Sequence, residues 1–113
     1  MDKIEKCRAA ILLFLNNYLA DTAQMIGSDV EYSILSDNKK LNFQLLATGW
    51  RGTHFIFGPV FHFEIKNNKI WLQCNNTERE IVDELMASGI DSQDIVLGFL
   101  SPYAREHSGF AVA

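Results

Sequence analysis

Cysteine is scarce in this sequence, and the short motifs of the common catalytic classes are missing. The 113 residues include only two cysteines, Cys7 and Cys74, which lie far apart and have no neighbouring Cys or His at metal-ligand spacing. We therefore interpret both as buried thiols in a reducing cytosol. No Ser, His and Asp occur in a catalytic order, and there is no glycine-rich phosphate loop or cysteine nucleophile motif.

Long apolar runs and concentrated positive charge are missing as well. The apolar run 11–15 is short and follows Asp2 and Glu5, which does not fit a signal peptide, and no run is long enough to span a bilayer. We therefore expect a cytoplasmic protein with no membrane segment. The net charge is -4 and the Lys and Arg residues are dispersed, so the basic face of a DNA-binding domain is missing. We expect no direct contact with nucleic acid.

The apolar residues that are present follow regular patterns. They make up 48% of the chain, enough for a core, and 113 residues suit one domain, so we predict a single domain over 1–113. The stretch 49–75 is its centre, because strict alternation there predicts strands over 60–66 and 69–75. Between these strands, Asn67-Asn68 suits a two-residue type I′ turn, since Asn tolerates a positive φ.

This turn predicts the pairing of the two strands it joins. The predicted pairs are Ile65 with Ile70, Phe63 with Leu72, Phe61 with Cys74, Glu64 with Trp71, and His62 with Gln73. The first three pairs join apolar residues, and a slip of one residue would set apolar against polar side chains throughout. The other two pairs place Trp71 among polar groups on the opposite surface, which is either covered or used.

A second turn precedes this ribbon, at Trp50-Arg51-Gly52. The apolar residues on its two sides share one parity: Leu41, Phe43, Leu45 and Ala47 before it, Phe55 and Phe57 after it. Keeping all of them on the core face requires an odd loop, and a three-residue loop with a left-handed Gly52 and a G1 bulge meets that requirement. Proline cannot donate to a ladder, so Gly58-Pro59 predicts a bulge or a sheet edge.

Periodicity predicts the elements on the N-terminal side. Apolar residues at i, i+3 and i+4 over 2–19 predict a helix, and the polar segment 21–28 is a connector. Strands are predicted at 30–34, 41–48 and 53–57, the last continuing into the ribbon.

On the C-terminal side, Thr77 and Glu80 have the spacing of a capping box in front of a second helix. Gly89 predicts a Schellman ending for that helix. A short strand at 95–97 and one helical turn from Ser101 follow. The predicted fold class is α+β, with an N-terminal helix, an antiparallel meander sheet of about five strands, a second helix, a short C-terminal strand and an irregular tail.

Two groups of side chains are candidates for catalysis. His62 and Glu64 share one face of a strand and can supply two metal ligands or an acid/base pair. In the C-terminal turn, Arg105 can clamp a carboxylate or phosphate, and His107 can titrate near neutrality. Exposed polar alternation and a solvated last turn are the simpler interpretations. A small-molecule- or metal-dependent enzyme built on either group is therefore the alternative hypothesis, and we assign no catalytic residue, metal or cofactor.

A candidate interaction surface is the other functional feature. It consists of Trp50, Arg51, Trp71, Tyr103, Arg105 and His107. Exposed Trp and Arg on a sheet are typical of an interface hot spot; the alternative is that Trp50 folds onto the core and Trp71 lies under a helix. The apolar tail 108–113 packs on the body of the domain or on a second subunit. Because the tail and the sheet edges need cover, we expect a homo-oligomer.

Motifs over nearly the whole chain resemble those of the XisI-like proteins, which are called fdxN-element excision controlling factors and are common in cyanobacteria. They are M-D-K-I-E-K-C-R, G-W-R-G, I-K-N-N-K-I-W-L-Q, T-E-R-E-I-V-D-E-L, G-I-D-S-Q-D-I-V-L-G-F and P-Y-A-R-E-H-S-G-F-A-V-A. The resemblance implies a non-catalytic accessory role in programmed excision of a DNA element, while a separate recombinase performs the recombination. The implied partner is XisH, which looks like a nuclease-fold protein, or the recombinase itself.

Overall fold

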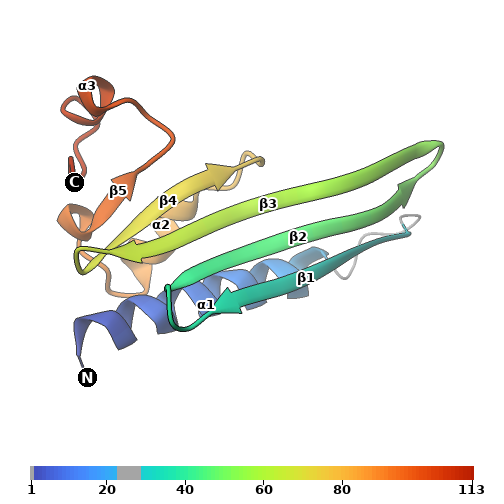
Figure 1. Cartoon of the computed structure of the whole chain (residues 1–113), viewed down its shortest axis with the longest axis horizontal. Coiled ribbons are helices and arrows are strands. Elements are labelled where there is room, and N and C mark those ends of the chain that lie inside the picture. The colour runs from blue at the N-terminus through green and yellow to red at the C-terminus, as the bar shows by residue number, and fades with distance from the viewer. Residues whose placement is uncertain (1, 23–28) are drawn as a thin grey trace.

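The computed structural model describes residues 2–22 and 29–113 and is organised around one five-stranded sheet with the order β1-β2-β3-β4-β5 (Figure 1). Its strands are β1 (Asp29–Asp37), β2 (Asn42–Arg51), β3 (His54–Lys66), β4 (Lys69–Asn75) and β5 (Ile95–Leu97). The pairs from β1 to β4 are antiparallel, and β5 runs parallel to β4. The last pair is parallel because a helical crossover separates its strands, as parallel pairing requires. The α+β prediction is therefore confirmed, with a sheet that is mostly antiparallel.

Helix α1 (Lys3–Thr22) covers one face of the sheet. Its first turn is capped by Asp2, whose Oδ1 accepts a hydrogen bond from the backbone N–H of Glu5 at 2.8 Å. The buried stripe of α1 packs onto β3 and β4, and the ring of Phe14 meets those of Phe61 and Phe63 edge-on. The helix ends three residues later than predicted, and residues 23–28 of the predicted connector lie outside the described part of the chain.

Helix α2 (Ile81–Ala87) packs beside α1 on the same face, but the predicted capping box does not form. Thr77 donates its hydroxyl to Asn75 Oδ1 at 2.7 Å and accepts from the N–H of Arg79. Its hydroxyl therefore already has both partners before the helix begins, and it does not cap the helix. Glu80 occupies the N-cap position and makes no side-chain cap bond. The prediction was wrong because the chain turns locally around Asn75 instead.

The end of α2 is the predicted Schellman motif. Gly89 has a φ of +97°, and the N–H of Ile90 donates to the carbonyl of Leu85 at 3.1 Å. A short 3-10 turn, η1 (Ser92–Asp94), follows, and Asp91 caps it by accepting a hydrogen bond from the N–H of Gln93. It leads directly into β5.

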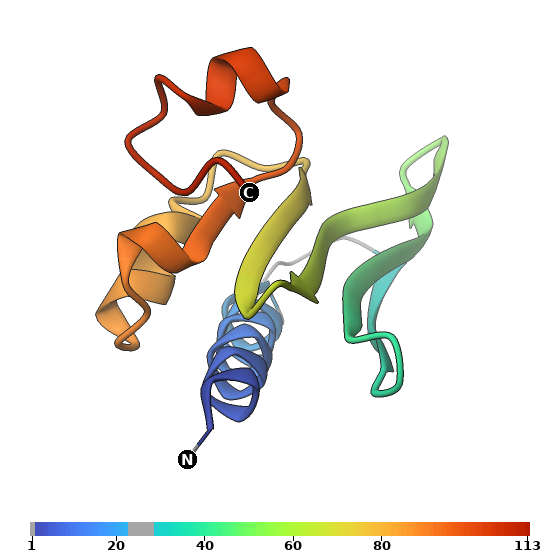
Figure 2. The same ribbon diagram turned by 60° about the vertical axis from the view of Figure 1, so that its left-hand side comes forward.

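The C-terminal segment crosses to the other side of the sheet. Figure 2 shows α1 and α3 (Pro102–Arg105) on opposite sides of β4 and β5. The chain then returns, and the N–H of Ala111 donates to the carbonyl of Ile95 at 3.0 Å while Ala111 bridges Val96. The tail therefore packs on the body of the domain, the first of the two alternatives. No helix among the described residues is long and apolar enough to cross a membrane.

The ribbon of β3 and β4 has the predicted turn and part of the predicted register. Asn67 and Asn68 have φ values of 55° and 58°, as a type I′ turn requires. The pairs next to the turn are as predicted: Ile65 with Ile70, Glu64 with Trp71, and Phe63 with Leu72. Beyond them Gln73 is an extra residue in β4, so that His62 pairs with Cys74 and Phe61 with Asn75. The predicted pairs of Phe61 with Cys74 and His62 with Gln73 were wrong because of this bulge.

The turn between β2 and β3 differs from the prediction. Arg51 pairs with His54, so the loop holds two residues, and Gly52 at its first position has a φ of +63°, as in a type II′ turn. With this even loop Phe55 and Phe57 turn away from the core, and they are 56% and 69% exposed. The core assignment of these two side chains was therefore wrong.

The predicted irregularity at Gly58-Pro59 restores the register. Leu46 pairs with Pro59, whereas Leu45 pairs with Phe61, so Val60 is an extra residue in β3. This bulge returns Phe61 to the core face, where it is fully buried.

Candidate interaction surface

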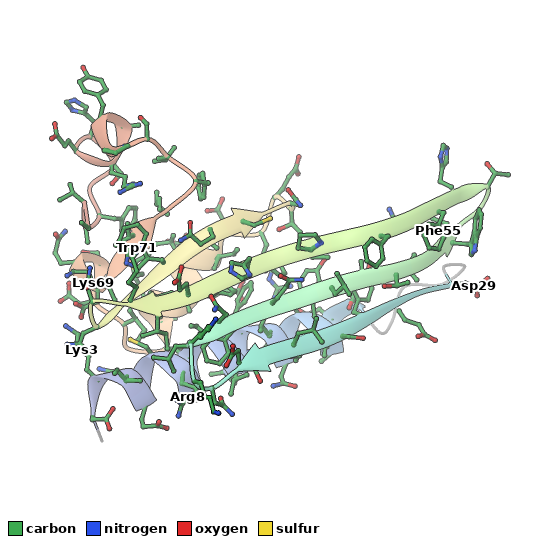
Figure 3. The ribbon with its side chains drawn as sticks, viewed as in Figure 1. Lys3, Arg8, Asp29, Phe55, Lys69 and Trp71 are labelled. Carbon is green, nitrogen blue, oxygen red and sulfur yellow. The ribbon has the colours of Figure 1, made fainter. Side chains whose placement is uncertain are left out.

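The six residues predicted to form one surface lie at opposite ends of the sheet. In Figure 3, Phe55 marks the end of the β2–β3 hairpin and Trp71 lies at the other end, near the C-terminal segment. Trp50 pairs with Phe55, so it lies at the hairpin end together with Arg51. The other predicted residues belong to the C-terminal end, so the six cannot act as a single contact surface.

Trp71 is buried, with 7% of its surface exposed. It packs with Val96 and Ala111, and its indole N–H donates to the carbonyl of Lys66 at 3.2 Å. The cations of Lys66 and Arg105 lie 4.2 Å and 5.1 Å from its ring centroid. The expectation that Trp71 is an exposed aromatic was therefore wrong, and its cover is the C-terminal segment.

Arg105 uses its guanidinium to hold that segment in place. Its Nε donates to the carbonyl of Leu100 at 3.0 Å and its Nη1 to the carbonyl of Val112 at 3.2 Å. These bonds close the C-terminal loop over Trp71 and leave Arg105 poorly placed to clamp a ligand. The neighbouring Tyr103 and His107 are exposed, and their rings lie 5.1 Å apart.

His62 and Glu64 share a face of β3, as predicted, but each is bonded to a glutamine. His62 Nδ1 lies 3.2 Å from Gln44 Oε1, and Gln73 Nε2 donates to Glu64 Oε2 at 3.3 Å. Within residues 2–22 and 29–113, no three His, Cys, Asp or Glu side chains gather where they could hold a metal ion. The geometry is that of polar pairs on a sheet face.

Three exposed aromatic residues gather on the outer face of the hairpin end, and we call Trp50, Phe55 and Phe57 the hairpin patch. The rings of Trp50 and Phe55 lie 5.2 Å apart at 58°, and Phe57 follows one pair further along the same face. Trp50 is 53% exposed, so it does not fold onto the core. The register continues the apolar surface through Pro59 and Leu46. Clustered exposed aromatics of this kind are typical of contact surfaces.

The hairpin patch is exposed because it lies on the sheet face opposite α1, at the end of the hairpin that is far from the C-terminal segment (Figure 1). Only Trp50 of the patch was among the predicted surface residues. A two-residue loop beginning with glycine is a known signal for a type II′ turn. Applied to Gly52-Thr53, this signal would have placed Phe55 and Phe57 on the outer face.

Comparisons with known proteins give one consistent result. Residues 1–112 match the family model described as XisI protein. The crystal structure of the fdxN element excision controlling factor XisI from Anabaena variabilis ATCC 29413 is similar over 99% of this chain and 100% of that chain, with 30% identity and a TM-score of 0.81. A XisI-like protein from the same organism is 36% identical over 96% of this chain and 99% of that chain, also with a TM-score of 0.81. No curated protein matches the chain.

Proposed function

The chain belongs to the XisI family, and we propose that it is a non-catalytic accessory factor that controls excision of a DNA element by binding a protein partner through the hairpin patch. The role in excision is supported by the similar Anabaena protein, which is described as an excision controlling factor. The binding role is supported by one observation above all, the exposure of three neighbouring aromatic side chains at the end of a projecting hairpin.

The physical argument concerns water and entropy. Aromatic side chains bury a large area when a partner covers them, and they lose little rotamer entropy because each has only two side-chain torsions. Trp50 and Phe55 already contact each other, so part of the ordering precedes binding. Because the patch lies on the sheet face away from α1, a partner can reach it without displacing that helix.

The net charge makes a protein the better candidate than DNA. The chain carries a formal charge of -4, and the hairpin patch itself contains no lysine or arginine. A duplex would gain few phosphate contacts on such a surface. The partner we propose is an XisH-like protein, the companion that the family resemblance implies.

Co-purification with an XisH-like protein tests the proposal. The chain should form a complex at micromolar concentration, and the variant Phe57→Ser should weaken it by about tenfold or more, since a buried aromatic at a hot spot contributes at least 1–2 kcal/mol. Trp50→Ser should have a similar effect.

The matched controls are Leu13→Ser on α1 and Tyr103→Ser on α3, which remove exposed apolar side chains elsewhere. Both should leave binding unchanged. If Tyr103→Ser weakens the complex and Phe57→Ser does not, the contact lies at the C-terminal end and the hairpin patch is the wrong surface. If no complex forms at all, the binding role is wrong.

A further inference from the structure

A cavity of about 540 Å³ opens on the core side of the hairpin, and Phe57 of the hairpin patch also contributes to its lining. It forms because Ala47 and Gly58, which pair across β2 and β3, are small and leave a hollow beside the larger side chains of Tyr18 and Ile56. Arg51 belongs to this side, since consecutive strand residues point to opposite faces and Trp50 faces outward.

The polar groups of the cavity are mostly donors that have no partner. Within the described ranges 2–22 and 29–113, the Arg51 guanidinium makes no ion pair or hydrogen bond, and the hydroxyls of Tyr18 and Tyr32 make no hydrogen bond. The residues 23–28 contain no Asp or Glu that could pair with Arg51. No acidic residue of the described chain lines the cavity.

The other two polar residues of the lining are already used. Asn76 donates its amide to the carbonyl of Pro59 at 2.8 Å, and Thr77 donates its hydroxyl to Asn75 at 2.7 Å. The polar groups of the cavity that have no hydrogen-bond partner in the described part of the chain are therefore one guanidinium and two phenol hydroxyls. A guanidinium has five donors and no acceptor, and this set matches the oxygens of a carboxylate or a phosphate.

Two further features favour an anion with an apolar body. Burial raises the pKa of the Tyr18 hydroxyl, so that it stays a neutral hydrogen-bond donor across the physiological range. The remaining walls are apolar, with Val60 and Ile56 beside the two tyrosine rings, which stand edge-to-face at 6.2 Å. Ligand sites commonly combine such walls with a few convergent polar groups.

We propose that this cavity binds a carboxylate or phosphate group carried on a small apolar body, with Arg51 as the charged ligand and the Tyr18 and Tyr32 hydroxyls as donors. The anion can be a free small molecule or an acidic side chain of a protein seated on the hairpin. The proposal does not depend on the proposed function, because an isolated chain binds the anion in either case.

Calorimetric titration of the whole chain with phenyl phosphate and with phenylacetate tests the proposal, with benzyl alcohol as the neutral probe of the same body. Both anions should bind saturably, and benzyl alcohol should bind at least about tenfold more weakly. Arg51→Gln should reduce the affinity for both anions by about tenfold or more, and Arg51→Lys should restore part of it because a point charge remains.

Lys39→Gln is the matched control, because Lys39 is an exposed cation at the opposite end of β2. It should leave the affinities unchanged, and unchanged melting temperatures should show that each variant folds. Absence of saturable anion binding, equal affinities in Arg51→Gln and Lys39→Gln, or equally tight binding of benzyl alcohol would each overturn the proposal. With anion binding established, competition between phenyl phosphate and the protein partner assigns the acid to the partner, and lack of competition assigns it to a free ligand.

Discussion

Gly49 lies where β1 and β2 approach so closely that a side chain does not fit between them. A Cβ at this position would lie 2.2 Å from the carbonyl oxygen of Asp29, and its φ is +143°. We expect Gly49→Ala to lower the free energy of unfolding by about 3 kcal/mol, because backbone strain and a backbone clash add. Urea denaturation measures the loss.

Gly52 provides the control for backbone strain alone. It also has a positive φ, but a Cβ there would meet nothing within 4 Å. Gly52→Ala should therefore cost only about 1 kcal/mol. If both substitutions lowered the free energy of unfolding equally, the close approach of β1 to Gly49 would not contribute to the loss.

Arg79 joins the two helices on the core face through one guanidinium. It binds Glu84 of α2 in a bidentate manner, at 2.7 Å and 3.0 Å, and Asp21 of α1 at 2.8 Å. The hydrogen bond to Glu84 is the main cause that raises the pKa of Arg79 above its ordinary value. Arg79→Lys should destabilise the fold, because lysine keeps the charge and loses the fork.

Double-mutant cycles separate the two partners of Arg79. The cycle with Glu84→Gln should give a coupling energy of about 1 kcal/mol, a value already reduced for solvent screening. Asp21 is 60% exposed, so the cycle with Asp21→Asn should give a much smaller coupling. A larger coupling to Asp21 would contradict the bidentate geometry as the source of stability.

The buried Cys7 gives the fold a pH dependence on the alkaline side. Burial, with a smaller contribution from Asp94, raises the pKa of the Cys7 thiol above its ordinary value of 9.0. The unfolded thiol therefore ionises first, so the stabilisation is complete below pH 9.0 and is lost as the pH rises toward the folded pKa.

The difference in unfolding free energy between the native chain and Cys7→Ala isolates this effect, since the other titrating groups cancel. Measured from about pH 8 upward, the difference should fall by up to about 1.4 kcal/mol per pH unit above 9.0. A difference that is constant with pH would show that Cys7 titrates normally in the folded chain.

At the scale of elements, periodicity and turn residues predicted much of the fold, and bulges account for most of the errors. The bounds of β4 and the turn at Asn67-Asn68 follow from alternation and from the tolerance of Asn for positive φ. Extra residues at Val60 and Gln73 shift the register, and nothing in a pattern of period two marks them except Pro59 beside the first.

The candidate site was harder to predict because it depends on contacts between distant segments. Trp71 is covered by Val96 and Ala111, which follow it by 25 and 40 positions, and no local pattern reveals such cover. The cavity beside Arg51 combines α1, β1, β2 and β3 in the same way. The residue types typical of interfaces marked Trp50 and Arg51 as candidates in the sequence. Only the fold showed which residues of other elements lie beside them.

The C-terminal segment and β4 form one unit, which Trp71 fluorescence can report. In a Trp50→Phe background, Trp71 is the only tryptophan, and its buried ring should emit at short wavelength and resist acrylamide. Arg105→Ala should shift the emission to longer wavelength and increase quenching, because two bonds that close the loop are lost. Removal of residues 109–113 should do so more strongly.

A Trp71→Phe background supplies the control for this experiment. There the emission comes from the exposed Trp50 at the far end of the sheet, and neither change should affect it. If Arg105→Ala leaves the Trp71 signal unchanged, then packing by Ala111 alone holds the segment closed.

At the scale of the whole molecule, the two halves of the outer sheet face are covered differently. The half formed by β4 and β5 lies under the C-terminal segment (Figure 2). The far end of β2 and β3 carries the hairpin patch, whose three aromatic side chains are each more than half exposed to solvent. Phe99 and Tyr103 are also exposed at the C-terminal end, but the hairpin patch is where three exposed aromatic rings gather on one sheet face, so it is the surface to which we expect a second molecule to add.

Self-association remains a prediction, and the fold narrows the surface that it can use. The tail is packed and Ala111 closes the edge of β5, which leaves the edge of β1 and the hairpin patch. β1 carries acidic residues at Asp29, Glu31 and Asp37 and no basic residue, so two such edges would repel each other. The hairpin patch is therefore the expected contact.

Light scattering at increasing concentration should give a mass above the 12.8 kDa of one chain, and this should persist at high salt because the contact is apolar. Phe57→Ser should return the mass to that of a monomer, while Ser33→Lys on β1 should not change it. The opposite result would place the contact at the β1 edge, and a monomer at every concentration would show that the patch serves other partners only. Since one patch cannot hold two molecules at once, an excess of the partner should also separate the self-associated chains.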